Sequence, residues 1–130
     1  MAESPCYLDT QAAVWLAQRD FRRFGAQARK AIDDAGELLI SPIVFLEMEY
    51  LQEIGRVLMR AEEIQLILHA DHAVRICGLE WIRVTRAAVH EKWTRDPFDR
   101  LIVAHAKANG HAPLVSSDRM IRKNYAQAVW

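Results

Sequence analysis

Apolar residues along the chain fall into two patterns. Short, nearly continuous apolar runs bounded by polar or turn-forming residues are typical of buried strands. They lie at residues 5–8, 37–40, 74–76, 112–115 and 128–130, of which 74–76 is the weakest. Longer segments with apolar residues at three- and four-residue spacing indicate amphipathic helices. They lie at residues 11–17, 20–33, 42–54, 60–70, 97–109 and 118–124, and segment 80–90 is ambiguous but favours a helix in its later half.

Local signals support several of these boundaries. Ser41 is suited to cap a helix whose first residue is Pro42, and Gly55 and Gly110 follow the last apolar positions of two helices. Strands that alternate with helices predict an α/β fold. We therefore expect a three-layer α/β/α sandwich around a central, mostly parallel sheet of four to five short strands.

The length and composition predict an ordinary globular protein. The chain has 130 residues, of which 52% are hydrophobic, and we expect it to form one domain over residues 1–130. It contains no apolar run long enough to span a membrane, and its first residues lack the pattern of a signal peptide, so we expect a cytoplasmic protein. Cys6 and Cys77 lie in apolar stretches and are expected to be buried, unpaired thiols.

The charge balance gives little information about partners. Lys and Arg together number 17, as do Asp and Glu, so the formal net charge is zero. This balance argues against a protein that coats DNA or RNA with a basic surface. It leaves open an enzyme that binds RNA through a local basic rim.

Three aspartates occupy positions where a helix begins, and a fourth lies one turn inside its helix. Ligands of parallel α/β sheets bind outside the carboxyl ends of the strands, which directs attention to Asp9 and Asp118. Each of them could simply cap the helix that follows. Asp96, before Pro97, is a natural N-cap, and Asp99 would then lie at the third helical position, where the helix dipole favours a carboxylate.

Glu47 is harder to explain by local structure. It shares a helical face with apolar residues, namely Ile43, Tyr50, Leu51 and Ile54, whereas Glu49 falls on a polar face and is expected to be solvated. A carboxylate in apolar surroundings costs several kcal/mol unless it is paired, protonated or bound to a metal. Glu47 is therefore either half of a buried salt bridge or a residue at the edge of a cleft.

Taken together, the acids indicate a metal centre. The four that follow strands or lie in the first two turns of the next helix should converge at one edge of the sheet: Asp9, Glu47, Asp99 and Asp118. Carboxylates brought this close repel one another unless a cation joins them. Ligands that are all oxygen suit Mg²⁺ or Mn²⁺, which can activate water for phosphodiester hydrolysis. The five histidines show no metal-ligand spacing, and His105 is expected to be a partly buried, hydrogen-bonded core residue.

Motifs of other enzyme classes are missing from the sequence. There is no P-loop, no GxGxxG and no GxSxG. A phosphatase of the haloacid dehalogenase type needs a second acid two residues after the first-strand aspartate, and Gln11 stands there. These absences leave metal-dependent hydrolysis as the favoured chemistry.

The ordered set of motifs resembles the PIN domain, and within it the VapC-type ribonuclease toxins of bacterial toxin–antitoxin pairs. The segments that carry this resemblance are YLDTQAAVWL, LLISPIVFLEMEYLQEIGRV, DPFDRLIVAHAKANGHAPLVSSD and the terminal AVW. Residues 56–94 match only loosely. Leu46 departs from the pattern, because many relatives have Trp just before the glutamate.

The resemblance implies an RNA-cleaving enzyme with Mg²⁺ or Mn²⁺ as cofactor. It implies that the metal is bound by Asp9, Glu47, Asp99 and Asp118, with Asp96 as a cap and outer partner and with Thr10 and Ser116 assisting through hydroxyl or water contacts. It also implies a homodimer and a small antitoxin protein whose C-terminal segment fills the cleft. The alternative is a catalytically inactive PIN-like interaction module.

Two further sets of residues bear on the partners. Cations near the proposed edge form a candidate phosphate-binding rim, namely Arg95, Arg100 and Arg119, followed by Arg122 and Lys123, with Arg22, Arg23, Arg29 and Lys30 on the early basic segment. Each could equally be a solvated surface charge. Apolar residues that could form a groove for an antitoxin helix or a dimer seam are Trp15, Leu16, Leu51, Ile54 and Leu58, although core packing explains any one of them.

Overall fold

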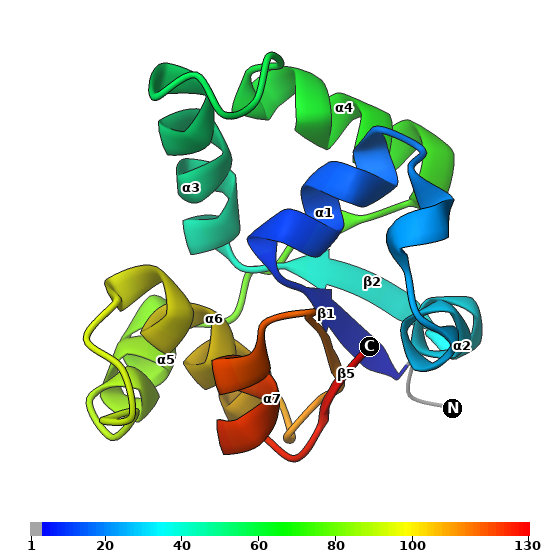
Figure 1. The fold of residues 1–130 in the computed structure, drawn as a ribbon. Helices are drawn as coiled ribbons and strands as arrows, with labels where there is room; N and C mark the ends of the chain where they lie inside the picture. The colour runs from blue at the N-terminus through cyan, green and yellow to red at the C-terminus, as the bar shows by residue number, and fades with distance from the viewer. Residues whose placement is uncertain (1–3) are drawn as a thin grey trace.

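The sheet is built from five strands, and every neighbouring pair of them is parallel. In a computed structural model that describes residues 4–130, the strands run in the order β3-β2-β1-β4-β5 (Figure 1). Their bounds are Pro5–Leu8 for β1, Glu37–Ile40 for β2, Arg75–Ile76 for β3, Leu114–Val115 for β4 and Ala128–Val129 for β5. The register pairs Tyr7 with both Leu39 and Leu114, so β1 lies at the centre. The predicted parallel α/β class is confirmed.

Seven α-helices surround this sheet. They are α1 (Thr10–Ala17), α2 (Ala26–Asp34), α3 (Pro42–Glu53), α4 (Ala61–His72), α5 (Trp81–Ala88), α6 (Pro97–Ala108) and α7 (Arg119–Asn124). The chain moves across the sheet in one direction from β1 to β3 and returns in the other direction through β4 to β5. Because parallel crossovers are right-handed, this reversal places the two groups of helices on opposite faces, which gives the three predicted layers.

Two helical segments differ from the prediction. The basic helix expected over residues 20–33 is a short 3-10 turn, Phe21–Arg23, followed by the separate helix α2. A Cβ at Gly25 would lie 2.3 Å from the Trp130 carbonyl oxygen, and Phe24 stacks on the Trp130 ring. The close approach of the last residue therefore interrupts the helix. Segment 80–90 is helical from Trp81 onward, rather than only in its later half.

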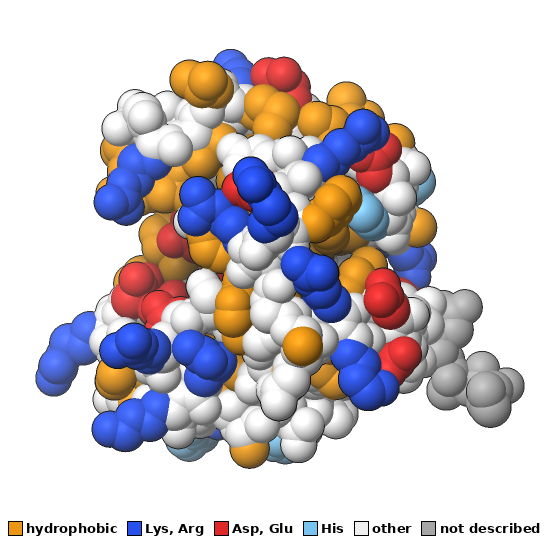
Figure 2. All heavy atoms as spheres, turned by 45° about the vertical axis from the view of Figure 1, so that its right-hand side comes forward, with side chains coloured by type: hydrophobic (Ala, Val, Ile, Leu, Met, Phe, Trp, Pro, Cys, Tyr) orange, Lys and Arg blue, Asp and Glu red, His pale blue; other side chains and the backbone are white. Residues whose placement is uncertain are grey.

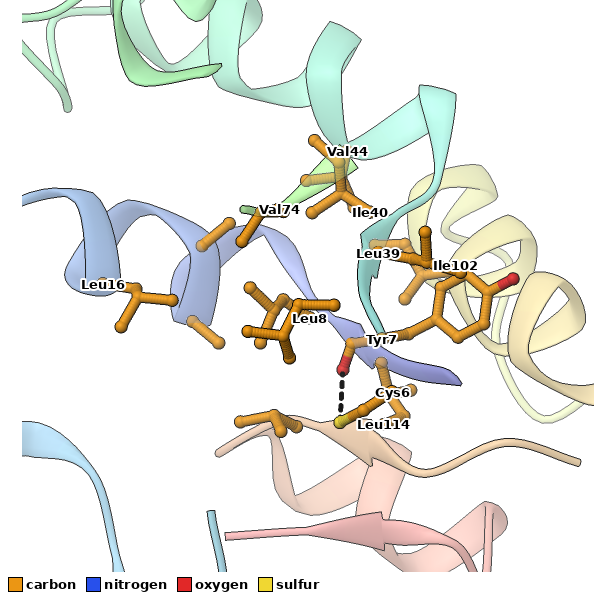
Figure 3. Packing of buried hydrophobic residues seen from close by; sticks show 14 of the residues in the cluster. Cys6, Tyr7, Leu8, Leu16, Leu39, Ile40, Val44, Val74, Ile102 and Leu114 are labelled. Atoms are coloured by element: carbon orange, nitrogen blue, oxygen red, sulfur yellow. Dashed lines mark hydrogen bonds between the residues drawn. The ribbon is translucent and has the colours of Figure 1, made fainter. Parts of the chain in front are cut away.

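Alternate residues of β1 point into the two halves of the core. Figure 3 shows Leu8 directed toward Leu16 of α1 and Tyr7 directed the other way, toward Ile102 of α6. Leu8, Leu114 and Ile40 are fully buried. Cys6 and Cys77 are buried, unpaired thiols, as predicted. Within residues 4–130, no helix is long and apolar enough to cross a membrane.

The functional cleft begins where β1 and β4 end side by side. The Asp9 amide donates to the Val115 carbonyl at 3.1 Å, so the ladder between the two strands reaches Asp9 itself. Ser116 continues β4 and is fully buried. The geometry of the sheet thus brings the residues after β1 next to the residues after β4, although more than 100 positions separate them in the sequence.

Candidate active site

A cleft of about 300 Å³ opens at the carboxyl ends of β1 and β4. The four carboxylates expected to converge, Asp9, Glu47, Asp99 and Asp118, all line it. The remaining lining residues are Thr10, Gln11, Leu51, Arg56, Ile102, Ser117 and Ile121. Figure 2 shows a hollow on one side of the molecule with acidic side chains in it and Lys or Arg side chains above and below it. The fold therefore gathers acids from four separate parts of the chain.

Two of these acids also cap helices. Asp9 Oδ1 accepts the Ala12 amide of α1 at 2.8 Å. Asp118 Oδ1 accepts the Met120 and Ile121 amides of α7 at 2.8 and 3.0 Å. In both cases the cap uses Oδ1 alone. Capping and cleft lining were alternatives in the sequence, yet these side chains do both.

Glu47 lies on the wall of the cleft rather than in a buried stripe. Thr10 Oγ1 donates a hydrogen bond to Glu47 Oε1. The buried face of α3 is formed by Val44 and Met48, whereas Tyr50 and Ile54, expected to surround Glu47 in the core, are 46% and 50% exposed. The expected apolar stripe around Glu47 is therefore not the buried face of α3. Periodicity shows which residues share a face but not which face packs against the core.

Two further expectations for α3, a buried salt bridge at Glu47 and a solvated Glu49, also differ from the structure. Among residues 4–130, no ion pair involves Glu47, so the buried salt bridge is wrong. Glu49 is not simply solvated: it pairs with Arg60 and accepts the Ala61 amide at 3.1 Å, which anchors the start of α4.

Asp96 and Asp99 have different surroundings although they are three residues apart. Asp96 Oδ1 accepts the Phe98 amide at 2.8 Å and the Asp99 amide at 3.5 Å, so Asp96 is the N-cap of α6, as predicted. The Asp99 side chain is half-buried and faces the cleft, one turn inside the helix.

Three acids in the cleft, Asp9, Glu47 and Asp99, hold their protons more tightly than isolated carboxyl groups. Burial, followed by the charges of Asp96, Asp118, Glu47 and Asp9, raises the pKa of Asp99 to about 7. Burial also raises the pKa of Asp9 to about 6, although hydrogen bonds from Ser116 and Ala12 oppose the shift. The pKa of Glu47 is raised by burial despite its bond from Thr10. The cleft thus concentrates negative charge that the protein itself does not neutralise.

Two buried hydroxyl groups support the carboxylates. Thr10, the first residue of α1, donates its hydroxyl to Glu47 of α3. Ser116 Oγ accepts the Asp118 amide at 3.1 Å, and its hydroxyl also stabilises ionised Asp9. These contacts fit the supporting place that the sequence analysis gave to Thr10 and Ser116.

The donor set suits a hard divalent cation. Its donors are carboxylate oxygens, which Mg²⁺ and Mn²⁺ prefer. A cation would favour the ionised forms of Asp9, Glu47 and Asp99, which burial and, after it, neighbouring charges disfavour. Within residues 4–130, no three His, Cys, Asp or Glu side chains lie close enough to form a ready-made ligand set.

The arginines of the predicted cationic rim do not line the cleft itself. Arg95, Arg100 and Arg119 do not line it, and Arg100 Nε donates to the Thr94 carbonyl at 2.8 Å. The early basic segment is also engaged locally: Arg23 pairs with Asp20, and Arg29 donates to the carbonyls of Phe21 and Phe24. The cation that does line the cleft is Arg56, which was not among the arginines predicted for the rim.

His105 lies on α6, the helix that carries Asp99, and its environment differs from the prediction. It is completely buried, and Nδ1 lies 3.0 Å from the Ser41 hydroxyl, while Nε2 has no hydrogen-bond partner within the part of the chain that the structure describes. Burial lowers the pKa of His105 to about 4. The expected core position is therefore correct, but only one ring nitrogen is satisfied.

Comparisons with known proteins agree with the fold and the motifs. The family model of the PIN domain matches residues 6–127. Ribonuclease VapC22 of Mycobacterium tuberculosis is 30% identical over 118 residues, which cover 90% of this chain and 89% of that protein.

Two solved structures share the fold. They are a toxin–antitoxin complex from Klebsiella pneumoniae (TM-score 0.60, 15% identity) and VapBC2 from Rickettsia felis bound to a DNA fragment from their promoter (TM-score 0.61, 17% identity). Each match covers 96% of both chains. The family model, the sequence relative and the fold lead to one conclusion: this chain belongs to the PIN domain family.

Proposed function

We propose that this protein is a metal-dependent endoribonuclease that acts as the toxin of a toxin–antitoxin pair. The observation that carries the proposal is the meeting of Asp9, Glu47, Asp99 and Asp118 in one cleft at the carboxyl ends of β1 and β4. Membership of the PIN family and the likeness to a protein named as a VapC ribonuclease support the choice of substrate.

Each residue of the site has a place in this mechanism. Asp9, Asp99, Asp118 and Glu47 would hold Mg²⁺ or Mn²⁺, which supplies a Lewis acid and an activated water when bound. Thr10 keeps the Glu47 carboxylate turned into the cleft, and Ser116 fixes the backbone at Asp118. Asp96 holds the first turn of α6, so that Asp99 faces the cleft from a rigid helix.

The proposal includes partners and a cellular location. We expect a small antitoxin protein and a second copy of the chain to bind, and both RNA and antitoxin would be met in the cytoplasm. Of the residues considered for a groove, Leu16 is a buried core residue and Trp15 packs against Trp130, whereas Ile54 and Leu58 are 50% and 95% exposed. The apolar surface offered to a partner therefore lies at the end of α3 rather than on α1.

An RNA cleavage assay tests the function. A panel of structured RNAs incubated with the protein should be cut in Mg²⁺ or Mn²⁺ and left intact in EDTA. Asp9→Asn and Asp99→Asn should abolish cleavage while the circular dichroism spectrum stays unchanged. Full activity in both variants would refute the metal-centre mechanism. A protein that binds no Mn²⁺ by calorimetry yet forms a tight complex with a small partner would instead support an inactive interaction module.

A further inference from the structure

The cleft has an electrostatic problem as a binding site for a polyanion. Four carboxylates line it, and RNA carries one negative charge per phosphate, so substrate and site repel each other wherever no cation intervenes. A bound divalent ion offsets only part of this charge. Among the residues that line the cleft, Arg56 is the one with a permanent positive charge.

The backbone at Arg56 is fixed by the way α3 ends. Gly55 adopts a left-handed conformation, with φ of +80°, and its amide donates to the Gln52 carbonyl at 3.0 Å. The Arg56 amide donates to the Leu51 carbonyl at 2.9 Å. Together these bonds form a Schellman motif, in which Arg56 is the second residue beyond the helix. Because Leu51 itself lines the cleft, the motif ties Arg56 to the cleft wall.

The Arg56 guanidinium is not engaged by the protein. Across residues 4–130 it takes part in no ion pair and no side-chain hydrogen bond, unlike Arg60, which pairs with Glu49, and Arg100, which binds a carbonyl. The positive charge of Arg56 is therefore not paired with an acid of the cleft.

We propose that Arg56 binds a backbone phosphate of the RNA substrate and so positions the strand against the carboxylates. This inference rests on the proposed ribonuclease function. A guanidinium suits the task because it donates two parallel hydrogen bonds to phosphate oxygens and stays charged at any physiological pH. Its anchored backbone at the cleft wall reduces the freedom that binding must remove.

The test compares Arg56→Ala with Arg86→Ala, which removes the same charge from an exposed position on α5 outside the cleft. Three quantities are measured for each: KM and kcat for a cleavable RNA in Mn²⁺, the salt dependence of binding of a fluorescent RNA, and Mn²⁺ affinity by calorimetry. Charge-assisted hydrogen bonds contribute about 1.5–3 kcal/mol, which corresponds to a rise in KM of roughly tenfold or more for Arg56→Ala. The salt slope should fall by about one, and Arg56→Lys should recover part of the loss.

The Mn²⁺ measurement separates substrate binding from structural damage. Removing a cation from an acidic cleft should leave Mn²⁺ affinity unchanged or increase it, whereas a disturbed site would bind both RNA and Mn²⁺ more weakly. Equal KM values for Arg56→Ala, Arg86→Ala and wild type would overturn the inference, as would parallel loss of RNA and Mn²⁺ affinity in Arg56→Ala. A wild-type protein that neither binds nor cleaves RNA would refute the ribonuclease proposal itself, which is a different result.

Discussion

Two polar regions of this protein, the cleft and a buried cluster around His105, differ in whether their polar groups are paired within the protein. In the cleft, four carboxylates face one another and none is paired with a cation. In the buried cluster, the Ser41 hydroxyl is hydrogen-bonded to His105. Asn109 donates at 2.8 Å to the Tyr7 hydroxyl, which is itself hydrogen-bonded to the Cys77 thiol.

Both regions are built on the same elements. β1 carries Tyr7 in the buried region and leads into Asp9 in the cleft, and α6 carries His105 and Asp99 in the same way. Hydrogen-bonded polar groups in the buried cluster hold β1, α3 and α6 together. The acids of the cleft form no ion pair within residues 4–130 and are therefore available to a ligand. We therefore expect substitutions in the cleft to change activity and substitutions in the buried cluster to change stability.

The largest effect is expected from Asp99→Asn. The variant removes a proposed metal ligand but keeps the shape of the side chain, so RNA cleavage should fall by about a thousandfold or more, in line with loss of a principal catalytic group. Because the change also relieves repulsion in the cleft, the metal-free variant should unfold at a higher urea concentration than wild type at pH 8. A variant that is both active and less stable would contradict the division between the two regions.

His105→Ala should show the opposite balance. It removes a fully buried ring and leaves the Ser41 hydroxyl without its partner, so the free energy of unfolding should fall by about 2–4 kcal/mol. Urea denaturation measures this loss, with His105→Gln as the control that keeps a hydrogen-bonding group. An unchanged unfolding midpoint would show that the buried contact does not join α3 to α6.

A smaller effect is expected from pH on the metal-free protein. The pKa values of Asp9 and Asp99 are about 6 and about 7 in the folded state, above the ordinary value of 3.8. Through these two acids the folded protein binds more protons than the unfolded chain between about pH 4 and 7, which lowers its stability as pH rises. Buried His105, whose pKa is lowered from 6.5 to about 4, acts in the opposite sense but offsets only part of the effect of two acids. Stability should therefore fall through this window and level off above it. Screening in the half-open cleft limits the size of the change.

The matched controls for this pH effect are chemical. Saturating Mn²⁺ and the Asp99→Asn variant should each flatten the pH dependence of the unfolding midpoint, because both remove the repulsion. A midpoint that rises from pH 4 to 7 in the metal-free wild type would mean that the raised pKa values of the two acids do not outweigh the lowered pKa of His105.

The smallest effect is expected at Asp96. Asp96→Ala removes the N-cap of α6 and should lower the free energy of unfolding by about 1 kcal/mol, whereas Asp96→Ser should restore most of it. Thermal unfolding of the two variants checks this. An Asp96→Ala protein as stable as wild type would remove Asp96 from the account of how α6 presents Asp99.

Much of the local structure could be predicted because its causes are local. The caps at Asp9, Ser41, Asp96 and Asp118 depend on one side chain and the two or three amides that follow it, and all four are present. The convergence of the acids was also predictable, since carboxyl ends of neighbouring parallel strands must meet. That the acids bind a metal stays a prediction.

Other features depended on contacts between distant residues. Glu49 was expected to be solvated, but it pairs with Arg60, which lies eleven positions later in the chain. The basic segment 20–33 was expected to form one helix, but the close packing of Trp130 against Gly25 interrupts it. No periodicity in either segment could reveal these partners.

The sequence by itself therefore determined the alternation of strands and helices, the capped helix starts and the edge of the sheet at which the acids gather. Only the tertiary structure decided which face of α3 is buried, which charges find partners and that Arg56, rather than the three predicted arginines, reaches the cleft. The physical reason is that propensity, capping and pleat act over a few residues, whereas burial and ion pairing depend on which distant surfaces meet when the chain packs.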